Sequence, residues 1–293
     1  MTNDVQLGYI KALDGSPLYA AYHPAADVKS TTSRLFPVVI APPLFEERKS
    51  AYAPLRRLAE KLAAAGHAVI RFDYRGSGES GGDAAKRRWS HLAEDVAVVR
   101  KTLARLSGKR DSVLLGLRLG GTLALQETIR AGGEGVIALA PIVKGAAQVR
   151  LWKMRSKIRA ELTDGGTGGR GDGGKSDATS PPEGEGRREP GSLGERGVRG
   201  EVLDFDGYEV NPAFFDDIAA IDLTKDLARL SCPGLVMQLS HRTDAAPETV
   251  ELMKILESRA RLECVRLEPF WDKLDDVDTA PVETAVLTAV SGF

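Results

Sequence analysis

Residues 113–125 read VLLGLRLGGTLAL, and this stretch decides the fold. An apolar strand pattern runs into a helical pattern through a tight turn. The turn, Gly116-Leu117-Arg118-Leu119-Gly120, has the glycine spacing of G-x-S-x-G, in which small residues let the chain turn sharply and lift the central side chain above a sheet. Arg118 stands at the central position, where that pattern has a serine.

Short apolar runs alternate with helical patterns on both sides of this turn. The alternation predicts strands over 37–41, 68–72, 112–115 and 135–140, and helices over 52–65, 89–106 and 122–130. Repeats of this kind favour a mostly parallel sheet with helices on both faces, an α/β fold. A hairpin, Tyr9 to Ala12 and Leu18 to Tyr22, is expected before it. In the helix after Trp89, the residues at steps of four and three form one apolar stripe that should face the sheet: Leu92, Val96, Val99, Leu103 and Leu106.

The chain changes character after a helix predicted over 148–162. Residues 165–200 hold 13 of the 31 glycines and almost no apolar side chains, which predicts a disordered linker. We expect strands at 235–239 and 262–267 to complete the first sheet. The interpretation is therefore one domain in two parts, 1–162 and 201–293, with an insertion at 163–200.

Gly169 to Ser176 satisfies the P-loop pattern G-x-x-x-x-G-K-[ST]. That pattern binds phosphate only between a buried strand and a helix. No apolar strand precedes it here, so we reject nucleotide binding.

The overall composition excludes several classes of partner. A net charge of -1 gives no global attraction to nucleic acid or to an anionic membrane. No signal-peptide pattern and no apolar run long enough to span a bilayer occur. Cys232 and Cys264 lie in apolar strand patterns that suit a reducing compartment. We expect a soluble cytoplasmic protein, without metal or cofactor and of unknown oligomeric state.

Two segments that precede the turn in the sequence match patterns that accompany such a turn. Residues 72–80, FDYRGSGES, resemble the D-x-R-G-x-G-x-S signature of α/β hydrolases, whose usual role is structural. The loop Ala41-Pro-Pro-Leu44-Phe45 occupies the place that supplies one oxyanion-hole amide in that fold, and the residue after the nucleophile supplies the other. The candidates are Leu44 or Phe45, and Leu119.

The catalytic triad itself is degenerate. Asp244 stands where the triad acid is expected, but Trp271 is near the place of the histidine. Arginine stays protonated and supplies no nucleophile, so standard Ser-His-Asp hydrolysis is not expected. We considered His241 as a substitute base and Ser77, Ser80 and the two cysteines as substitute nucleophiles, and their places in the pattern favour ordinary loop or strand roles.

Further segments resemble the α/β hydrolases associated with the exosortase A and exopolysaccharide system, type 2, within the serine aminopeptidase (S33) group. The segments that carry the resemblance are residues 41–50, 116–121, 140–155, 207–214 and 268–281. The family looks to carry a PPxxEE loop, an elbow arginine and a PFW motif. The resemblance implies that Arg118 is a property of the group, although fold-level similarity does not establish a reaction.

Three functions remain open. The first is a non-hydrolytic pseudoenzyme that binds a small acidic ligand or a protein partner near Leu44, Phe45, Glu46, Glu47, Arg118 and Leu119. Because a guanidinium opposes the dipole of the helix that follows it, Glu46, Glu47 or Asp244 should pair with Arg118; such a pair is equally compatible with a purely structural role. The second is a hydrolase or acyltransferase that acts on an ester, thioester or amide through an unrecognised nucleophile. The third is an interaction subunit for polysaccharide or protein-sorting machinery.

Overall fold

The computed structural model describes residues 4–28, 34–164, 203–242, 244–272 and 277–293. Its main sheet has the strand order β1-β2-β4-β3-β5-β6-β9-β10. The first two strand pairs are antiparallel and the others are parallel. The strands are β1 (Gln6–Lys11), β2 (Pro17–His23), β3 (Val38–Ala41), β4 (Val69–Phe72), β5 (Val113–Leu117), β6 (Gly135–Leu139), β9 (Gly234–Ser240) and β10 (Ala260–Arg266).

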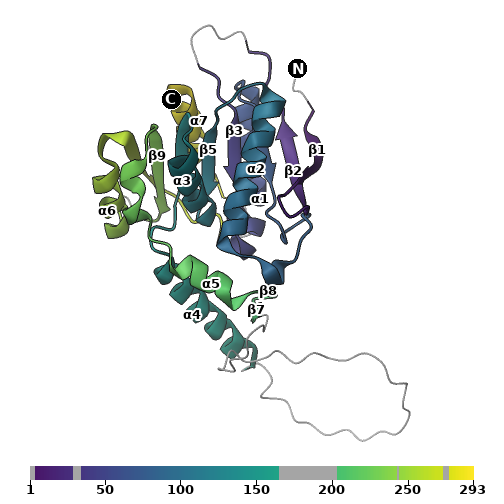
Figure 1. The fold of residues 1–293 in the computed structure, drawn as a ribbon. Helices are drawn as coiled ribbons and strands as arrows, with labels where there is room; N and C mark the ends of the chain where they lie inside the picture. The colour runs from purple at the N-terminus through teal and green to yellow at the C-terminus, as the bar shows by residue number, and fades with distance from the viewer. Residues whose placement is uncertain (1–3, 29–33, 165–202, 243, 273–276) are drawn as a thin grey trace, which may run out of the picture.

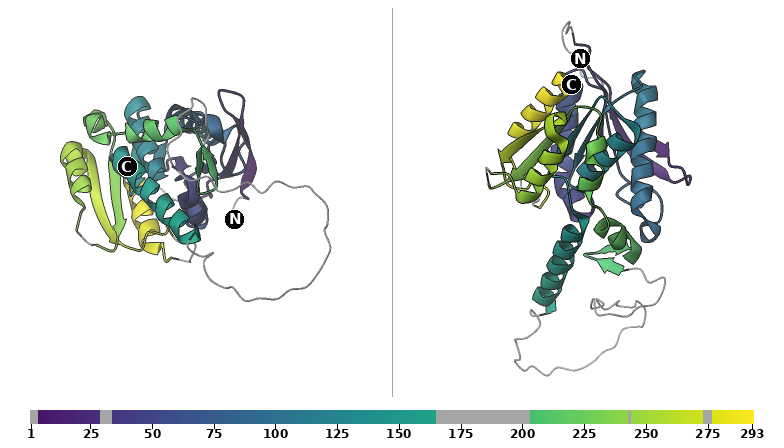
Figure 2. Two further views of the ribbon diagram at one scale, coloured as in Figure 1. Left: turned by 90° about the horizontal axis from the view of Figure 1, so that it is seen from below. Right: turned by 60° about the vertical axis from the view of Figure 1, so that its left-hand side comes forward.

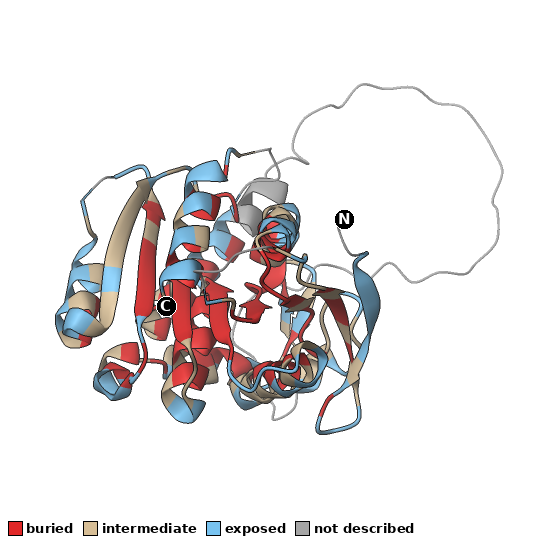
Figure 3. Cartoon of the chain, turned by 90° about the horizontal axis from the view of Figure 1, so that it is seen from above, coloured by how far each residue is buried: buried red, intermediate tan, exposed pale blue. Residues whose placement is uncertain are grey.

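Helices cover both faces of this sheet (Figure 1). One face carries α1 (Phe45–Ala64) and α7 (Ala280–Gly292), and the other carries α2 (Trp89–Ser107), α3 (Leu119–Ala131) and α6 (Pro247–Leu256). Successive residues of a central strand enter opposite layers, so Leu114 packs with the α2 layer and Leu115 with the α1 layer. The predicted α/β-hydrolase architecture is confirmed, and the central strands are buried throughout (Figure 3).

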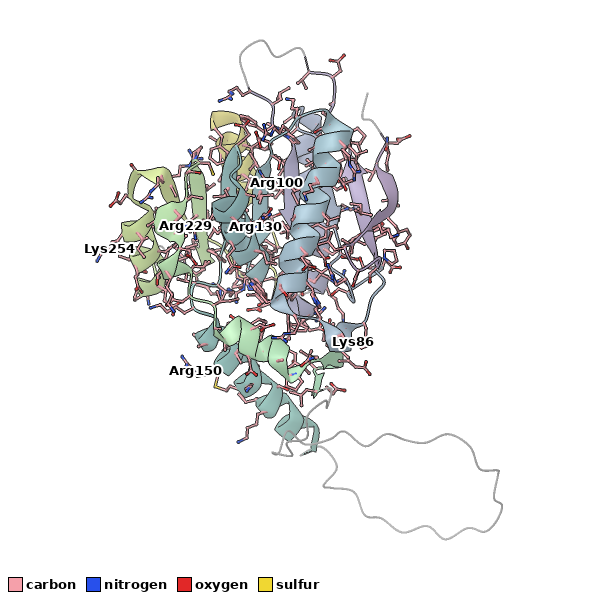
Figure 4. The ribbon with its side chains drawn as sticks, in the orientation of Figure 1. Lys86, Arg100, Arg130, Arg150, Arg229 and Lys254 are labelled. Atoms are coloured by element: carbon pink, nitrogen blue, oxygen red, sulfur yellow. The ribbon has the colours of Figure 1, made fainter. Side chains whose placement is uncertain are left out.

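The apolar stripe on α2 is buried as predicted from Leu92 to Leu103. Leu106 is the exception, since it is 49% exposed. It lies in the last turn, just before the left-handed Gly108 ends the helix. Arg100 of α2 and Arg130 of α3 both pair with Glu127, which ties the two neighbouring helices together (Figure 4).

A second layer of structure lies beyond one end of the sheet (Figures 1 and 2). It consists of α4 (Gly145–Asp164), the hairpin β7 (Leu203–Phe205) and β8 (Tyr208–Val210), and α5 (Pro212–Ala219). We call these four elements the cap. Its presence was not predicted, although its main helix was expected at 148–162. Residues 165–202 lie outside the part of the chain that the structure describes. They include the expected linker and the P-loop match.

The strands after the cap return to the main sheet. β9 pairs in parallel with β6, and β10 pairs with β9, so the expectation that the later strands complete the first sheet is confirmed. In the part of the chain that the structure describes, no helix is long and apolar enough to span a bilayer.

Candidate functional site

The turn between β5 and α3 has the geometry of a nucleophile elbow. Arg118 adopts φ 57° and ψ -121°, a conformation that non-glycine residues rarely adopt. A Cβ atom on Gly120 would lie 2.2 Å from the carbonyl oxygen of Ala41, and one on Gly116 would lie 2.1 Å from the carbonyl oxygen of Gly120. Both glycines are therefore required, because backbone fills the space that a side chain would need.

The Arg118 side chain is held by four groups at this elbow. Its Nε donates to Glu47 Oε1 at 3.3 Å, one terminal nitrogen donates to the carbonyl of Ala140 at 3.3 Å, and the other donates to Gln148 Oε1 at 2.9 Å. The guanidinium also stacks on the ring of Trp271. These contacts join the elbow to α1, to the end of β6, to the cap and to the segment after β10.

Of the three carboxylates expected as partners of Arg118, Glu47 forms the ion pair, and both side chains are largely buried. Burial raises the pKa of the Glu47 carboxyl, and the neighbouring guanidinium only partly offsets this effect. Glu46 points elsewhere, since it accepts from Lys49 at 2.8 Å and from the Tyr208 hydroxyl at 3.0 Å. The two glutamates thus do different work: one neutralises the elbow, and the other holds the cap hairpin.

The oxyanion-loop candidates lie at helix starts. Phe45 is the first residue of α1 and Leu119 is the first residue of α3, positions whose backbone N–H groups have no acceptor within their own helices. Leu44 immediately precedes α1 and is buried. Phe45 has a φ of 55°, and its ring lies 5.2 to 5.3 Å from the rings of Trp152, Phe205 and Tyr208 of the cap.

A cavity of about 400 Å³ lies between the start of α1, the cap and the segment after β10. Aromatic rings and carboxylates dominate its lining, which comprises Leu44, Phe45, Glu46, Glu47, Ser50, Trp152, Arg155, Phe205, Asp206, Tyr208, Trp271 and Asp272. Arg155 pairs with Asp272 at 3.3 Å across α4 and the last loop. Of the residues proposed from the sequence, Leu44 to Glu47 and Trp271 line this cavity, whereas Arg118 and Leu119 are not among the lining residues. The sequence did not indicate the side of the cavity that the cap supplies.

The other two triad positions, Asp244 and Trp271, lie in different surroundings. Asp244 is exposed and bound to Arg242, so it is not the partner of Arg118. His241 is exposed. Trp271 is buried against Arg118, in the region where the histidine was expected. Within the described residues, the hydrogen bonds of the Arg118 guanidinium therefore involve a carboxylate, an amide and a carbonyl, and no imidazole.

The alternative nucleophiles have structural bonds. Ser77 Oγ accepts from Arg87 at 2.7 Å, and Ser80 Oγ donates to the carbonyl of Asp73 at 2.6 Å. Burial raises the pKa of the Cys232 thiol to about 11, which leaves little thiolate at neutral pH. Arg75 of the upstream signature binds the buried Asp95 through its backbone and its guanidinium. Across the described residues, no group of three or more potential metal-ligating side chains is found.

The sequence did not identify Gln148 as a residue of the site. Its side-chain oxygen accepts from Arg118, while its buried Nε2 has no hydrogen-bond partner in the described part of the chain. Exchanging the two amide atoms would point a donor at the guanidinium, so the assigned orientation is the consistent one. The only signal in the sequence was a glutamine in an otherwise apolar and basic helical stretch.

The fold and the elbow define an α/β-hydrolase-fold domain in which an arginine, Arg118, stands at the centre of the elbow. Residues 47–165 match the family described as serine aminopeptidase, S33, and no curated protein matches the chain.

Several solved structures share this architecture. Ferulic acid-bound Est1E from Butyrivibrio proteoclasticus is 18% identical, with a TM-score of 0.60 over 97% of this chain and 96% of its own. The Pyrococcus furiosus esterase PF2001 is 14% identical, with a TM-score of 0.61 over 99% and 90%. DcsB in complex with its substrate analogue is 16% identical, with a TM-score of 0.63 over 98% and 99%. At these identities the similarity establishes the fold.

Proposed function

We propose that this domain is a pseudoenzyme that binds a small ligand or a protein partner in the cavity beneath the cap, without Ser-His-Asp hydrolysis. The observation that carries the proposal is the side chain at the centre of the elbow and the contacts that hold it. Its central side chain is a guanidinium held by Glu47, Gln148, the Ala140 carbonyl and Trp271. A permanently protonated group in this position cannot attack a carbonyl carbon, and it fills the place that an attacking hydroxyl needs.

The ligand that we propose is acidic. A carboxylate or phosphate would compete with Glu47 for the fork of Arg118, because guanidinium groups bind such anions through two parallel hydrogen bonds. An acceptor atom beside Arg118 would also satisfy the unpaired Nε2 of Gln148. The carboxylates of Glu46, Asp206 and Asp272 also face the cavity and would repel an anionic ligand.

Tryptophan fluorescence tests this proposal directly, because Trp152 and Trp271 line the cavity. The third tryptophan, Trp89, lies on α2 and is removed as background in a Trp89→Phe variant. We expect small carboxylates to change the emission saturably and the matching primary amides to have no effect. Arg118→Gln should abolish the response to the carboxylates. Saturable binding of the amides alone would contradict an acidic ligand, and no response to any compound would contradict the cavity as a binding site.

The competing function is hydrolysis or acyl transfer on an ester, thioester or amide, and its support is that the similar Pyrococcus furiosus protein is an esterase. A fluorophosphonate probe separates the two, because it labels an activated serine covalently. Labelling of a single serine, together with turnover, would replace our proposal with an active enzyme.

The biological setting is the third part of the proposal. The resemblance to the exosortase-associated hydrolases suggests a cytoplasmic partner from a polysaccharide or protein-sorting system. Affinity capture with the products of neighbouring genes tests this setting, and capture that Arg118→Gln abolishes would link the partner to the elbow.

A further inference from the structure

The edge strand β1 exposes a row of apolar side chains. Four of the nine large apolar side chains that are exposed in the described residues fall between positions 5 and 13, namely Val5, Leu7, Tyr9 and Leu13. Leu7 is 65% exposed and Tyr9 is 63% exposed. Side chains alternate along a strand, so Leu7 and Tyr9 share one face. Figure 3 shows this strand beside the N-terminus as an exposed edge next to the buried centre of the sheet.

Among the residues that the structure describes, the N–H and C=O groups on the outer side of β1 have no hydrogen-bond partner. Tyr19 of β2 is the register partner of Tyr9. The Tyr19 N–H donates to Ser80 Oγ, and its carbonyl accepts from the Asp73 N–H, so both groups point away from β1. The pair formed by Tyr9 and Tyr19 is therefore not hydrogen-bonded, and the N–H and C=O of Tyr9 face the free edge. Hydrogen-bonded and non-bonded pairs alternate in an antiparallel ladder, which gives Leu7 the same outward orientation.

Protective features that usually block an edge are missing from β1. The six residues contain no proline, and their single charge is Lys11, at the end of the strand. Gly8, near the middle, has open space where a Cβ would stand. Long apolar edges of this kind pair with other strands unless charges, prolines or bulges prevent it.

We propose that two copies of this chain form a dimer by antiparallel pairing of their β1 edges, with the two-fold axis at Gly8. This register places Leu7 opposite Tyr9 of the second copy, where each pair exchanges its two outward hydrogen bonds. It places Lys11 opposite Val5, so the two positive charges do not face each other. The glycines meet in a non-hydrogen-bonded pair, where strands approach most closely. A second copy fits this edge because its Leu7 and Tyr9 offer the N–H donors and C=O acceptors that the outward groups of the first copy need.

Sedimentation velocity from low to high micromolar concentration tests the dimer. Tyr9→Pro removes an N–H that has no partner among the described residues, and Leu7→Lys places a charge in the apolar row. We expect the wild type to dimerise and each variant to weaken dimerisation by about tenfold or more, as for a central interface residue. The matched control is Leu106→Lys on α2, which changes an equally apolar exposed residue away from this edge and should leave the dimer intact. A monomeric wild type at every concentration, or a dimer that neither variant weakens, would overturn the proposal.

Hydrogen exchange on the wild type keeps the test independent of variant folding. The amide protons of Leu7 and Tyr9 should be protected only at concentrations where the dimer is populated. Fast exchange at all concentrations would exclude pairing at this edge. Protection that does not depend on concentration would mean that another segment of the same chain covers β1, which also overturns the dimer.

Discussion

The guanidinium carbon of Arg118 lies 5.3 Å from the centroid of the Trp271 ring. In an active relative of this fold, the elbow and the loop after the last strand would bring a nucleophile to its base. Here the same meeting of two distant segments places a fixed cation on an aromatic ring. Such a contact contributes about 0.5 to 2 kcal/mol, depending on how far it is desolvated. The contact between Arg118 and Trp271 therefore joins the elbow to the segment after β10.

Restoring the serine alone should not restore hydrolysis. We expect negligible turnover of p-nitrophenyl acetate by the wild type and by Arg118→Ser, because a serine hydroxyl also needs an imidazole to accept its proton, and Trp271 stands in that region. Loss of a triad serine or histidine costs roughly 10⁶ in kcat in a hydrolase that uses them. Turnover by the wild type that one serine or cysteine substitution abolishes would contradict the loss of catalysis.

The ion pair between Arg118 and Glu47 should show strong energetic coupling. Removing one member of a buried pair leaves the other charge uncompensated and typically costs about 3 to 5 kcal/mol. We expect Arg118→Met to destabilise the domain more than the double variant Arg118→Met with Glu47→Gln, as measured by urea unfolding. Glu46→Gln is the matched control, since its partners are Lys49 and Tyr208, and its effect should add to that of Arg118→Met. Additive effects for Glu47 as well would mean that the pair contributes no specific stability.

The free energy of unfolding should depend on pH through the carboxyl group of Glu47. Burial raises the pKa of its carboxyl in the fold above the unfolded value of about 4.3. Between these two pKa values the folded state binds more protons than the unfolded state, so the free energy of unfolding falls as pH rises. The stabilising contribution is complete below the unfolded pKa and is lost as pH rises through the folded pKa. We expect the difference in unfolding free energy between wild type and Glu47→Gln to decrease from acidic to neutral pH in chemical denaturation. A difference that stays constant or increases with pH would show that the Arg118 charge outweighs burial.

Residues 165–200 should be dispensable for folding. Their composition lacks the apolar side chains that anchor a segment to a core. Replacing them with a short glycine-serine linker between Asp164 and Glu201 should leave the melting temperature within about 2 to 4 °C of the wild type, a shift that corresponds to about 1 kcal/mol for a domain of this size. A larger drop would show that the segment packs on the domain.

The sequence by itself determined the sheet, the elbow and the identity of the side chain at its centre. These features follow from local rules: apolar alternation specifies strands, the spacing of Gly116 and Gly120 specifies a tight turn, and an arginine at position 118 lacks a nucleophile in any structure. The segment after the strand predicted at 37–41, which holds Glu47, is placed beside the elbow by the same local pattern. The ion pair of Arg118 with one of the two neighbouring glutamates could accordingly be predicted.

Only the tertiary structure decided which glutamate binds Arg118, and that a cap closes over it. Glu46 and Glu47 are adjacent in sequence, but a helix directs consecutive side chains about 100° apart, so one meets the elbow and the other meets Tyr208. The cap escaped prediction because β7 and β8 have three residues each, too few to show a period, and they follow the long glycine-rich segment. Asp244 fits the triad position in the sequence yet lies exposed beside Arg242, since its direction depends on a loop path that no local pattern records.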